Sequence, residues 1–410
     1  MRILYLNPSG QLGGAEIMLL NLMGSLRAAC PDWSLHLVTA EPGSLAERAA
    51  DMGVHTCVVP FPFELARFGD SGREKLLWRG SLAAASVPGY VKRLRRAIRD
   101  ATPDVIHANG FKMHILAALP GISGTPLIWT LNDYVRGRPV MTHLFRIFGK
   151  RCSAAIALSD SVAADARKVC GIRPPVYRVY NGIDTETFSP QGSLIDLDEV
   201  SGLGPARPET IRVGLVATFA KWKGHHAFLE AIRLLPPDLP VRGYIVGGPL
   251  YQTVGSQYRL EELRAKAIEL GVAGKVGFTG YIDKPASAMR SLDILVHAST
   301  APEPFGMAIV EAMACGRAVI VSNAGGAVEI FTDGKDALGH APGDARALAG
   351  CIARLAKDAE LRSRLGRAAR LTAVSGFDRA LLAQSLVPIY NELAGMPGLK
   401  RSLRERDAAV

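Results

Sequence analysis

Short apolar runs alternate with longer amphipathic segments along the first half of the chain. An apolar run of four to eight residues between turn residues indicates a buried strand, whereas apolar residues spaced three or four apart indicate a helix. Regular alternation of the two predicts a parallel sheet covered by helices. We predict strands at Arg2–Asn7, Ser34–Ala40, Val54–Val59, Asp104–Ala108, Leu127–Leu131 and Ala154–Leu158, and helices at Ala15–Ala29 and Ala46–Met52.

The same pattern starts again after residue 210. Strand Ile211–Ala217, a loop and helix His225–Leu235 repeat the opening architecture, so we predict an α/β protein with two stacked Rossmann-like domains. The later predicted elements are strands Arg242–Val246, Val276–Thr279 and Asp293–His297, and helices Tyr258–Leu270, Met307–Cys315 and Arg379–Leu393. The predicted domains are 1–185 and 211–376, with a linker at 186–210 rich in Gly, Pro and Ser, a C-terminal helix at 377–396 and a tail at 397–410.

Composition agrees with two globular domains and adds an electrostatic expectation. A chain of 410 residues is long for one core, and its 48% apolar and 21% charged residues are typical of soluble globular proteins. The formal net charge of +10 favours an acidic partner such as a nucleotide, a phosphate or an anionic membrane. No nucleic-acid-binding motif accompanies the charge, so we expect no nucleic-acid partner.

The cysteines and the apolar runs bear on the compartment. The six cysteines form no C-x-x-C pair, which favours a reducing compartment and argues against zinc. The first residues become polar too early for a signal peptide. The uncharged run 113–132 contains two prolines and two glycines, so it indicates helix, turn and strand rather than a membrane span. We expect a cytoplasmic protein, with contact to the inner face of the cell membrane as a further expectation.

The stretch 299–311, STAPEPFGMAIVE, carries the strongest candidate chemistry. It joins a predicted strand to a predicted helix through a Pro/Gly loop, and the first backbone N–H groups of such a helix make an anion site. Glu303 and Glu311 lie on either side of that site, with Glu311 about 7–8 Å along the helix axis from Gly306. Carboxylates accept hydroxyl groups, so a sugar, a diphosphate and a ribose suit this arrangement. The backbone donors would be those of Phe305, Gly306 and Met307.

These residues resemble a known family. Glu303, seven residues and Glu311 are similar to the E-x7-E signature of the large retaining glycosyltransferase family with the two-domain GT-B fold. The likeness extends through PEPFG to GG-x-x-E at Gly325, Gly326 and Glu329, and covers most of the chain more sparsely. It implies two Rossmann-like domains facing across a cleft, with the C-terminal helix returning to the first. It also implies that Glu303 orients the transferred sugar and Glu311 binds the ribose.

The loop TFAKWKG carries the predicted counter-charge for the diphosphate. In the resembled family a Lys at the position of Lys223 faces the donor diphosphate, usually with an Arg five residues earlier. Thr218 stands there in this chain, so we expect Lys221 to supply the second cation from a shifted position. A surface lysine is the alternative for Lys223. The turn after strand 276–279 borders the nucleotide base in the family, which makes Tyr281 a predicted donor contact.

The first loop, 8–14, has two competing interpretations and a plainer third. A dinucleotide site requires G-x-G-x-x-G and a later acid, but the glycines at 10, 13 and 14 have the wrong spacing, although Glu41 ends the second strand. The GGAE sequence resembles the glycosyltransferase turn, in which Gly13 and Gly14 let the backbone approach the donor phosphate or sugar. A tight turn that needs glycine for its conformation alone is the third interpretation.

Polar residues after two strands predict the acceptor side. His107 and Asn109 follow one strand, and Asn132, Asp133 and Tyr134 follow another. The family commonly has a His where Asn132 stands, and an Asn donates a hydrogen bond but does not shuttle a proton. The stretch 62–99 mixes aromatic and basic residues, which suits either a membrane-surface segment or a helix with a solvated basic face.

The resemblance and the residues together predict a retaining hexosyltransferase. We expect it to move a hexose from a nucleoside-diphosphate sugar to a hydroxyl of a saccharide or lipid-linked acceptor in polysaccharide or glycolipid assembly. No cofactor and no metal are expected, because Lys223, the 305–307 amides and the Gly13–Gly14 turn would stabilise the leaving diphosphate. The alternatives are a sugar-nucleotide epimerase of the same fold and an inactive nucleotide-sugar-binding protein. Catalytic roles fall to Glu303, Lys223 and Asn132.

Overall fold

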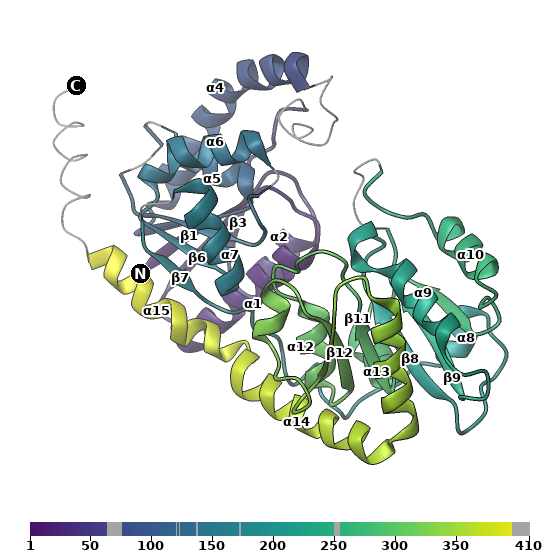
Figure 1. The fold of residues 1–410 in the computed structure, drawn as a ribbon. Helices are drawn as coiled ribbons and strands as arrows, with labels where there is room; N and C mark the ends of the chain where they lie inside the picture. The colour runs from purple at the N-terminus through teal and green to yellow at the C-terminus, as the bar shows by residue number, and fades with distance from the viewer. Residues whose placement is uncertain are drawn as a thin grey trace, which may run out of the picture. The chain divides into compact units, whose positions relative to one another are not determined.

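The computed structural model describes residues 1–63, 76–119, 121–122, 124–136, 138–171, 174–249 and 255–395, with only the backbone of 76–85 and 169–170. The chain divides into two compact units (Figure 1). The first unit combines Met1–Gly182 with the segment that begins at Arg379, and the second is Ile183–Asp378. The segment that begins at Arg379 therefore packs with the first unit, although it follows the second unit in the sequence.

The first unit is built on a seven-stranded sheet in the order β3-β2-β1-β4-β5-β6-β7. Every adjacent pair of strands is parallel, and β1 pairs with β2 on one side and with β4 on the other. The chain therefore reverses its direction of winding between β1 and β4. The strands are β1 (Arg2–Asn7), β2 (Ser34–Thr39), β3 (His55–Val58), β4 (Val105–Asn109), β5 (Leu127–Leu131), β6 (Ala154–Ala157) and β7 (Val176–Arg178).

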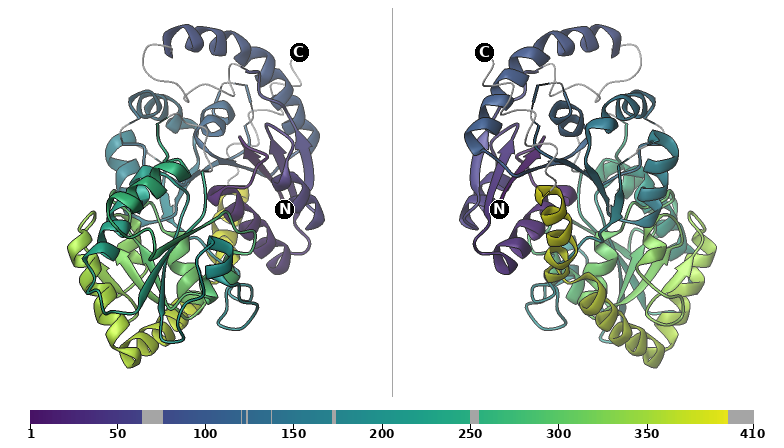
Figure 2. Two further views of the ribbon diagram at one scale, coloured as in Figure 1. Left: turned by 90° about the vertical axis from the view of Figure 1, so that its right-hand side faces the viewer. Right: turned by 90° about the vertical axis from the view of Figure 1, so that its left-hand side faces the viewer.

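Helices connect these strands, and the last helix of the chain joins them. Helix α15 lies against α1 (Figures 1 and 2), where the backbone N–H of Ala383 donates to Ser25 at 3.1 Å. The Tyr390 hydroxyl on α15 lies 3.2 Å from that of Tyr5 on β1. The helices are α1 (Gly14–Ala29), α2 (Ser44–Asp51), α4 (Leu76–Ala101), α5 (Phe111–Ala117), α6 (Pro139–Phe148), α7 (Asp160–Asp165) and α15 (Ala380–Gly395), with shorter turns at Gly149–Arg151 and Ala166–Cys170.

The second unit repeats this topology on a six-stranded sheet in the order β10-β9-β8-β11-β12-β13. All its strand pairs are parallel, and the winding reverses between β8 and β11. The strands are β8 (Ile211–Val216), β9 (Val241–Val246), β10 (Val276–Gly280), β11 (Ile294–His297), β12 (Ala318–Ser322) and β13 (Leu338–His340). The helices are α8 (Leu197–Ser201), α9 (His225–Leu234), α10 (Leu260–Glu269), α11 (Pro285–Arg290), α12 (Met307–Ala314), α13 (Ala345–Lys357) and α14 (Ala359–Phe377), with 3₁₀ turns η4 (Lys221–Lys223) and η5 (Gly326–Glu329).

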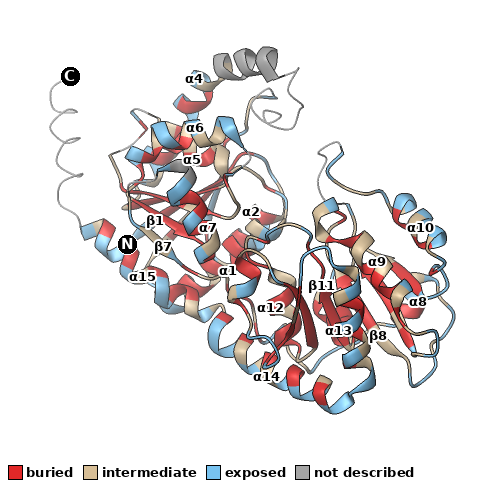
Figure 3. Ribbon diagram, viewed as in Figure 1, coloured by how far each residue is buried: buried red, intermediate tan, exposed pale blue. Residues whose placement is uncertain are grey.

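Both sheets are buried, as parallel sheets covered by helices must be. Figure 3 shows buried strands and helices that are buried on one side only. In β4, β6, β11 and β12 every residue is buried, whereas the edge strand β3 is exposed throughout. The near-continuous apolar runs that predicted these central strands are explained by this burial on two faces.

The predicted linker 186–210 is not a linker. It belongs to the second unit and contains α8, whose Asp198 side chain is buried. The Asp198 carboxylate accepts a hydrogen bond from Tyr244 at 2.6 Å and forms an ion pair with Arg242 on β9. Composition suggested a flexible segment, but these buried polar contacts between residues distant in sequence attach it to the sheet.

Two further predictions concern the 62–99 stretch and the tail. The tail 397–410 and residues 64–75 lie outside the described residues. In the described part of α4, Tyr90, Leu94 and Ile98 are buried, whereas Arg93 and Arg96 are exposed. This part therefore has the solvated basic face of the plainer interpretation, and membrane contact stays a prediction. Across the described ranges, no helix is both long and apolar enough to span a bilayer.

Candidate active site

The topology of the second unit places two loops at one point of its sheet. In open α/β sheets, ligands bind beyond the carboxyl ends of the strands where the winding reverses. Here that point lies between β8 and β11. The loop after β8 carries Lys223, and the loop after β11 carries Glu303. Two residues that lie 80 positions apart in the sequence are thus brought to the same edge of the sheet.

Lys223 and Glu303 form a partly buried ion pair. The Lys223 ammonium donates to both carboxylate oxygens of Glu303, at 3.0 and 2.8 Å. The lysine side chain is 22% exposed and the glutamate side chain 8%. Burial alone would raise the pKa of Glu303, but the charge of Lys223 and a hydrogen bond from His297 outweigh it and hold the pKa well below its usual range. Glu303 is therefore an ionised acceptor.

A group of residues that sequence reasoning did not assign to the site holds Glu303 from behind. Ser299 donates to its carboxylate at 2.9 Å, and His297 Nε2 lies 3.1 Å from the same oxygen. The backbone N–H of Ser322 donates to His297 Nδ1 at 3.3 Å, which leaves the ring proton on Nε2, where it faces Glu303. The position of both residues at the carboxyl end of β11 was the available signal.

The loop itself is fixed to its neighbour by backbone bonds. The Glu303 N–H donates to the carbonyl of Ala324 at 3.2 Å, and the Gly326 N–H donates to the Glu303 carbonyl at 2.7 Å. The GG-x-x-E segment thus supports the Glu303 loop directly. Because both backbone groups of Glu303 are bonded in this way, its carboxylate has little freedom, which suits a group that must orient a ligand.

Helix α12 begins at this loop with a conformation that requires glycine. Gly306 precedes the helix with φ of 114°, and a Cβ on it would lie 2.6 Å from Ile309. Phe305 is buried, with its ring centroid 5.8 Å from that of Phe377. The first N–H groups of a helix have no intrahelical acceptor, and the helix dipole adds positive potential there. The structure thus places Met307 and the two residues before it at the N-terminus of α12, beside Glu303, and anion binding there stays a prediction.

Glu311 lies one turn into α12 and differs electrostatically from Glu303. Its side chain is half-buried, and burial raises its pKa to about 7. No basic side chain lowers it among the described residues that influence it. One end of α12 thus carries an ionised carboxylate at Glu303 and a carboxyl group close to half-protonation at neutral pH.

The remaining predicted donor residues of this unit are more exposed. Lys221 is exposed, and its ammonium lies 5.7 Å from the centre of the Tyr258 ring rather than on Glu303. Thr218 lies half-buried in the same loop. The Tyr281 side chain is 77% exposed at the carboxyl end of β10.

The glycine loop of the first unit is anchored by two glutamates. Glu16 of the GGAE sequence accepts from the Gly13 N–H at 3.1 Å. Glu41 accepts from the Gly10 N–H at 3.1 Å, so this carboxylate closes the loop and does not serve as the ribose acceptor of a dinucleotide site. A Cβ on Gly14 would meet no atom within 4 Å. Open space beside Gly14 agrees with an approach by a ligand and does not require one.

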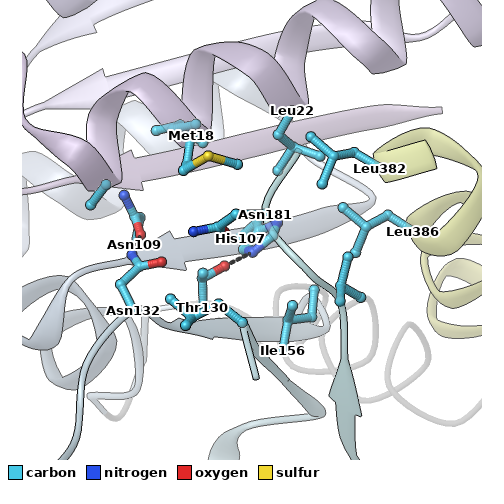
Figure 4. Close-up of a pocket in the computed structure, with 14 residues that line it drawn as sticks. Met18, Leu22, His107, Asn109, Thr130, Asn132, Ile156, Asn181, Leu382 and Leu386 are labelled. Carbon is cyan, nitrogen blue, oxygen red and sulfur yellow. Dashed lines mark hydrogen bonds between the residues drawn. The ribbon is translucent and has the colours of Figure 1, made fainter. Parts of the chain in front are cut away.

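Three polar residues of the predicted acceptor side share a small pocket in the first unit (Figure 4). The pocket has a volume of about 40 Å³ and is lined by His107, Asn109 and Asn132 together with apolar side chains such as Met18 and Leu386. Asp133 is not among its lining residues. It pairs instead with Arg138 at 2.7 Å.

Within this pocket the asparagines are connected and the histidine is neutral. Asn132 donates to Asn109, which donates to Asn7 at 2.7 Å. His107 is buried between Thr130 and the Tyr390 hydroxyl, which lies 2.6 Å from its Nδ1. Burial lowers the pKa of His107 to about 3, so its ring is uncharged at neutral pH.

Comparison with known proteins assigns both units. Residues 12–187 match Glycosyltransferase Family 4, and residues 204–372 match Glycosyl transferases group 1. The chain is 36% identical to the phosphatidyl-myo-inositol mannosyltransferase of Mycobacterium tuberculosis over 78% of its length and 82% of the relative. It is 28% identical to the lipopolysaccharide core biosynthesis glycosyltransferase LpsE of Rhizobium meliloti. That match spans only about half of each protein, 49% of this chain and 55% of LpsE.

Solved structures show the same fold. Anabaena HepE, crystallised in complex with UDP, superimposes with a TM-score of 0.77 at 24% identity, covering 96% of this chain and 100% of HepE. A Rickettsia africae glycosyltransferase gives a TM-score of 0.74 at 18% identity, over 96% and 98% of the two chains. Two parallel-sheet α/β domains with these neighbours confirm the predicted GT-B fold. The chain therefore belongs to the GT-B glycosyltransferases, with a family 4 region in its first half and a group 1 region in its second.

Proposed function

We propose that this protein transfers a hexose from a nucleoside-diphosphate sugar to a hydroxyl group of a saccharide or lipid-linked acceptor, with retention of anomeric configuration. The observation that carries the proposal is the Lys223–Glu303 ion pair at the N-terminus of α12. A cation, an ionised acceptor and a helix N-terminus at one switch point suit a diphosphate joined to a sugar.

The chemistry follows from these groups. The donor's diphosphate would bind the α12 N-terminus and Lys223, which would leave Glu303 free to accept the sugar hydroxyls. Glu311 would accept the ribose hydroxyls. As the bond between the anomeric carbon and the phosphate oxygen breaks, Lys223 and the amides would stabilise the departing diphosphate. The acceptor oxygen would bond to the same face of that carbon, and its proton would pass to the leaving phosphate oxygen.

In this route the protein's own charges would stabilise the leaving diphosphate, which would otherwise need a cation from solution. Lys223 and the helix N-terminus supply positive potential, so we propose that the reaction needs no metal and no cofactor. Retention is proposed because the leaving group itself would take the acceptor proton on the face that it leaves. Asn132 would contribute a hydrogen bond rather than a proton.

The acceptor side and the membrane form a second part of the proposal. Helix α6 exposes Val140 and Ile147, and Arg146, Lys150 and Arg151 lie on or just after it. Apolar side chains among basic ones suit the surface of an anionic membrane. Relatives act in lipopolysaccharide core biosynthesis and on phosphatidyl-myo-inositol, by their names. We place this protein on the cytoplasmic side of a membrane, acting on a glycolipid or growing polysaccharide.

Donor binding and turnover together test the proposal. Thermal unfolding is recorded with UDP, GDP and ADP sugars for the wild type, Glu311→Ala and the exposed control Glu360→Gln. One nucleotide should stabilise the wild type and the control but not Glu311→Ala. Turnover with glycolipid acceptors should then fall about 10²–10³-fold in Glu303→Gln, as for loss of a group that acts in the transition state.

The outcomes separate the proposal from its rivals. Nuclear magnetic resonance of the product should show the anomeric configuration of the donor, and an inverted product would refute retention. Release of free sugar without any acceptor would favour the epimerase. Donor binding without turnover on any acceptor would favour an inactive binding protein. No stabilisation by any nucleotide sugar would remove the donor site altogether.

A further inference from the structure

The second unit has a larger pocket at the amino ends of its central strands. Its volume of about 620 Å³ lies within the range of about 300–1,000 Å³ that is typical for small-molecule sites. Asp293, which precedes β11, and Ala318, which begins β12, line it. Lys223 and Glu303 lie at the opposite ends of the strands, in the loops that follow the carboxyl ends of β8 and β11. The length of β11 alone separates the two sites by about 10 Å.

One face of α14 forms a wall of this pocket. The helix residues that line it recur every three or four positions, as one face of a helix requires. Gly366 lies in the middle of that face, and a Cβ on it would lie 2.4 Å from the carbonyl oxygen of Gly316. The helix therefore approaches the turn before β12 very closely. The residues of α14 at the pocket are Ala359, Arg362, Ser363, Gly366, Arg367, Arg370 and Leu371.

Three arginines at the pocket are held in place by helix ends. Arg362 donates to the Leu355 carbonyl on α13 at 2.6 Å. Arg370 donates to the carbonyl of Ala314, the last residue of α12, at 2.9 Å, and Arg317 donates to the carbonyl of Cys315 at 3.1 Å. These bonds satisfy carbonyls that a helix leaves unpaired. Each guanidinium has five N–H groups, and these bonds use one nitrogen of Arg362 and of Arg370 and two of Arg317, so they orient the remaining groups without exhausting them.

The charges that line this pocket do not balance. Four arginines line it, the three above and Arg367, against one carboxylate, Asp293, which leaves a formal charge of +3 (four minus one). Within the described residues, none of the four forms an ion pair. Helix capping explains the anchored nitrogens but leaves this excess of positive charge in a concave site unexplained. An anionic ligand would balance it.

The arrangement also contains groups for a neutral, hydroxylated part of a ligand. Asp293 gives one carboxylate oxygen to the backbone N–H of Arg212 at 2.7 Å. Among the described contacts its second oxygen has no donor, and Ser363 adds a hydroxyl that accepts from Arg367 at 2.5 Å. Arginine forks match the oxygens of a phosphate, whereas a carboxylate repels phosphate and accepts hydroxyls.

We propose that this pocket binds a sugar phosphate, with the phosphate on the arginines of α14 and Arg317 and a sugar hydroxyl on Asp293. The site is separate from the donor site, so it stands or falls independently of the proposed transfer reaction. An exposed basic surface would bind any anion weakly. A pocket with fixed guanidinium groups and one carboxylate should instead distinguish a sugar phosphate from phosphate alone.

Calorimetric titration at fixed ionic strength tests this, with glucose 6-phosphate and inorganic phosphate as probes. The wild type should bind glucose 6-phosphate saturably and more tightly than phosphate. Arg367→Gln and Ser363→Glu should each weaken it by about tenfold, as expected for losing or opposing one charge-assisted contact. The matched control is Arg364→Gln, which removes the same charge three residues before Arg367 on α14, outside the pocket lining.

The variants also guard against a folding artefact. Arg367 and Ser363 are exposed, so both variants should unfold at the wild-type temperature. No saturable binding by the wild type would overturn the proposal, as would equal weakening in Arg364→Gln or unchanged affinity in both pocket variants. Equal affinity for phosphate and glucose 6-phosphate would overturn the assignment of a sugar to the Asp293 side.

Discussion

Replacing Glu311 by Gln should make the unliganded protein more stable and yet abolish donor binding. Burial raises the pKa of Glu311 to about 7, above the ordinary value of about 4.5. The folded protein therefore resists ionisation of this group. The resulting stability is fully present below about pH 4.5 and is lost as the pH rises through about 7. Glutamine has nearly the same shape and never ionises, so it should escape this loss.

The magnitude follows from the pKa difference. An increase from about 4.5 to about 7 corresponds to about 3 kcal/mol at pH 8. Part of the side chain reaches solvent, so we reduce the figure to about 2 kcal/mol. For a unit of this size that is about 4–8 °C in melting temperature. At pH 5 the gain should shrink to about a quarter, because that pH is only about half a unit above the ordinary pKa, at which the loss of stability begins.

Calorimetric unfolding of the wild type and Glu311→Gln at pH 5 and pH 8, without ligand, measures this difference. Glu360→Gln on the exposed side of α14 is the control and should shift neither melting temperature by more than about 1 °C. A Glu311→Gln protein no more stable than the wild type at pH 8 would refute the reasoning. A gain of equal size at both pH values would also refute it, because the effect would then come from packing.

Two further perturbations test the geometry around α12. Lys223→Met should destabilise the second unit by about 3 kcal/mol at pH 7, because it leaves the buried Glu303 carboxylate without its cation. Lys223→Arg should retain most of the stability, and thermal unfolding measures both variants. Gly366→Ala should lower the free energy of unfolding by at least about 2 kcal/mol, because its Cβ would lie 2.4 Å from the Gly316 carbonyl oxygen. The control is Gly350→Ala, where a Cβ meets nothing within 4 Å, and it should be neutral or stabilising by the same measurement.

The sequence predicted the two-domain α/β fold because that fold depends on local signals. Apolar runs between turn residues located the central strands, and the repeated strand–loop–helix unit predicted two domains with parallel sheets. The Glu303 loop was singled out because it joins a predicted strand to a predicted helix, and Lys223 through the family resemblance. The structure brings the two side chains together, and their roles stay predictions. The resemblance added roles for Glu303 and Glu311, which the structure places in the loop before α12 and within α12, and these roles stay predictions.

Contacts across the sheet could not be predicted in the same way. His297 supports Glu303 through a proton whose position is set by the backbone of Ser322, a residue on a neighbouring strand. The segment 186–210 was interpreted as a linker because its composition says nothing about the buried bonds of Asp198. The first case depends on which strands are neighbours and the second on where α8 packs against the sheet, and a single sequence determines neither.

The opposite behaviour of Glu303 and Glu311 indicates how the unliganded site prepares for a donor. Glu303 is ionised because Lys223 and His297 compensate for its burial, whereas Glu311 carries a desolvation cost that no described neighbour offsets. A phosphate on Lys223 would weaken the hold on Glu303 and leave it available for sugar hydroxyls. Hydroxyl donors on Glu311 would stabilise its charged form and lower its pKa. Donor binding should therefore release protons near pH 7, and a buffer-independent binding enthalpy at that pH would contradict this view.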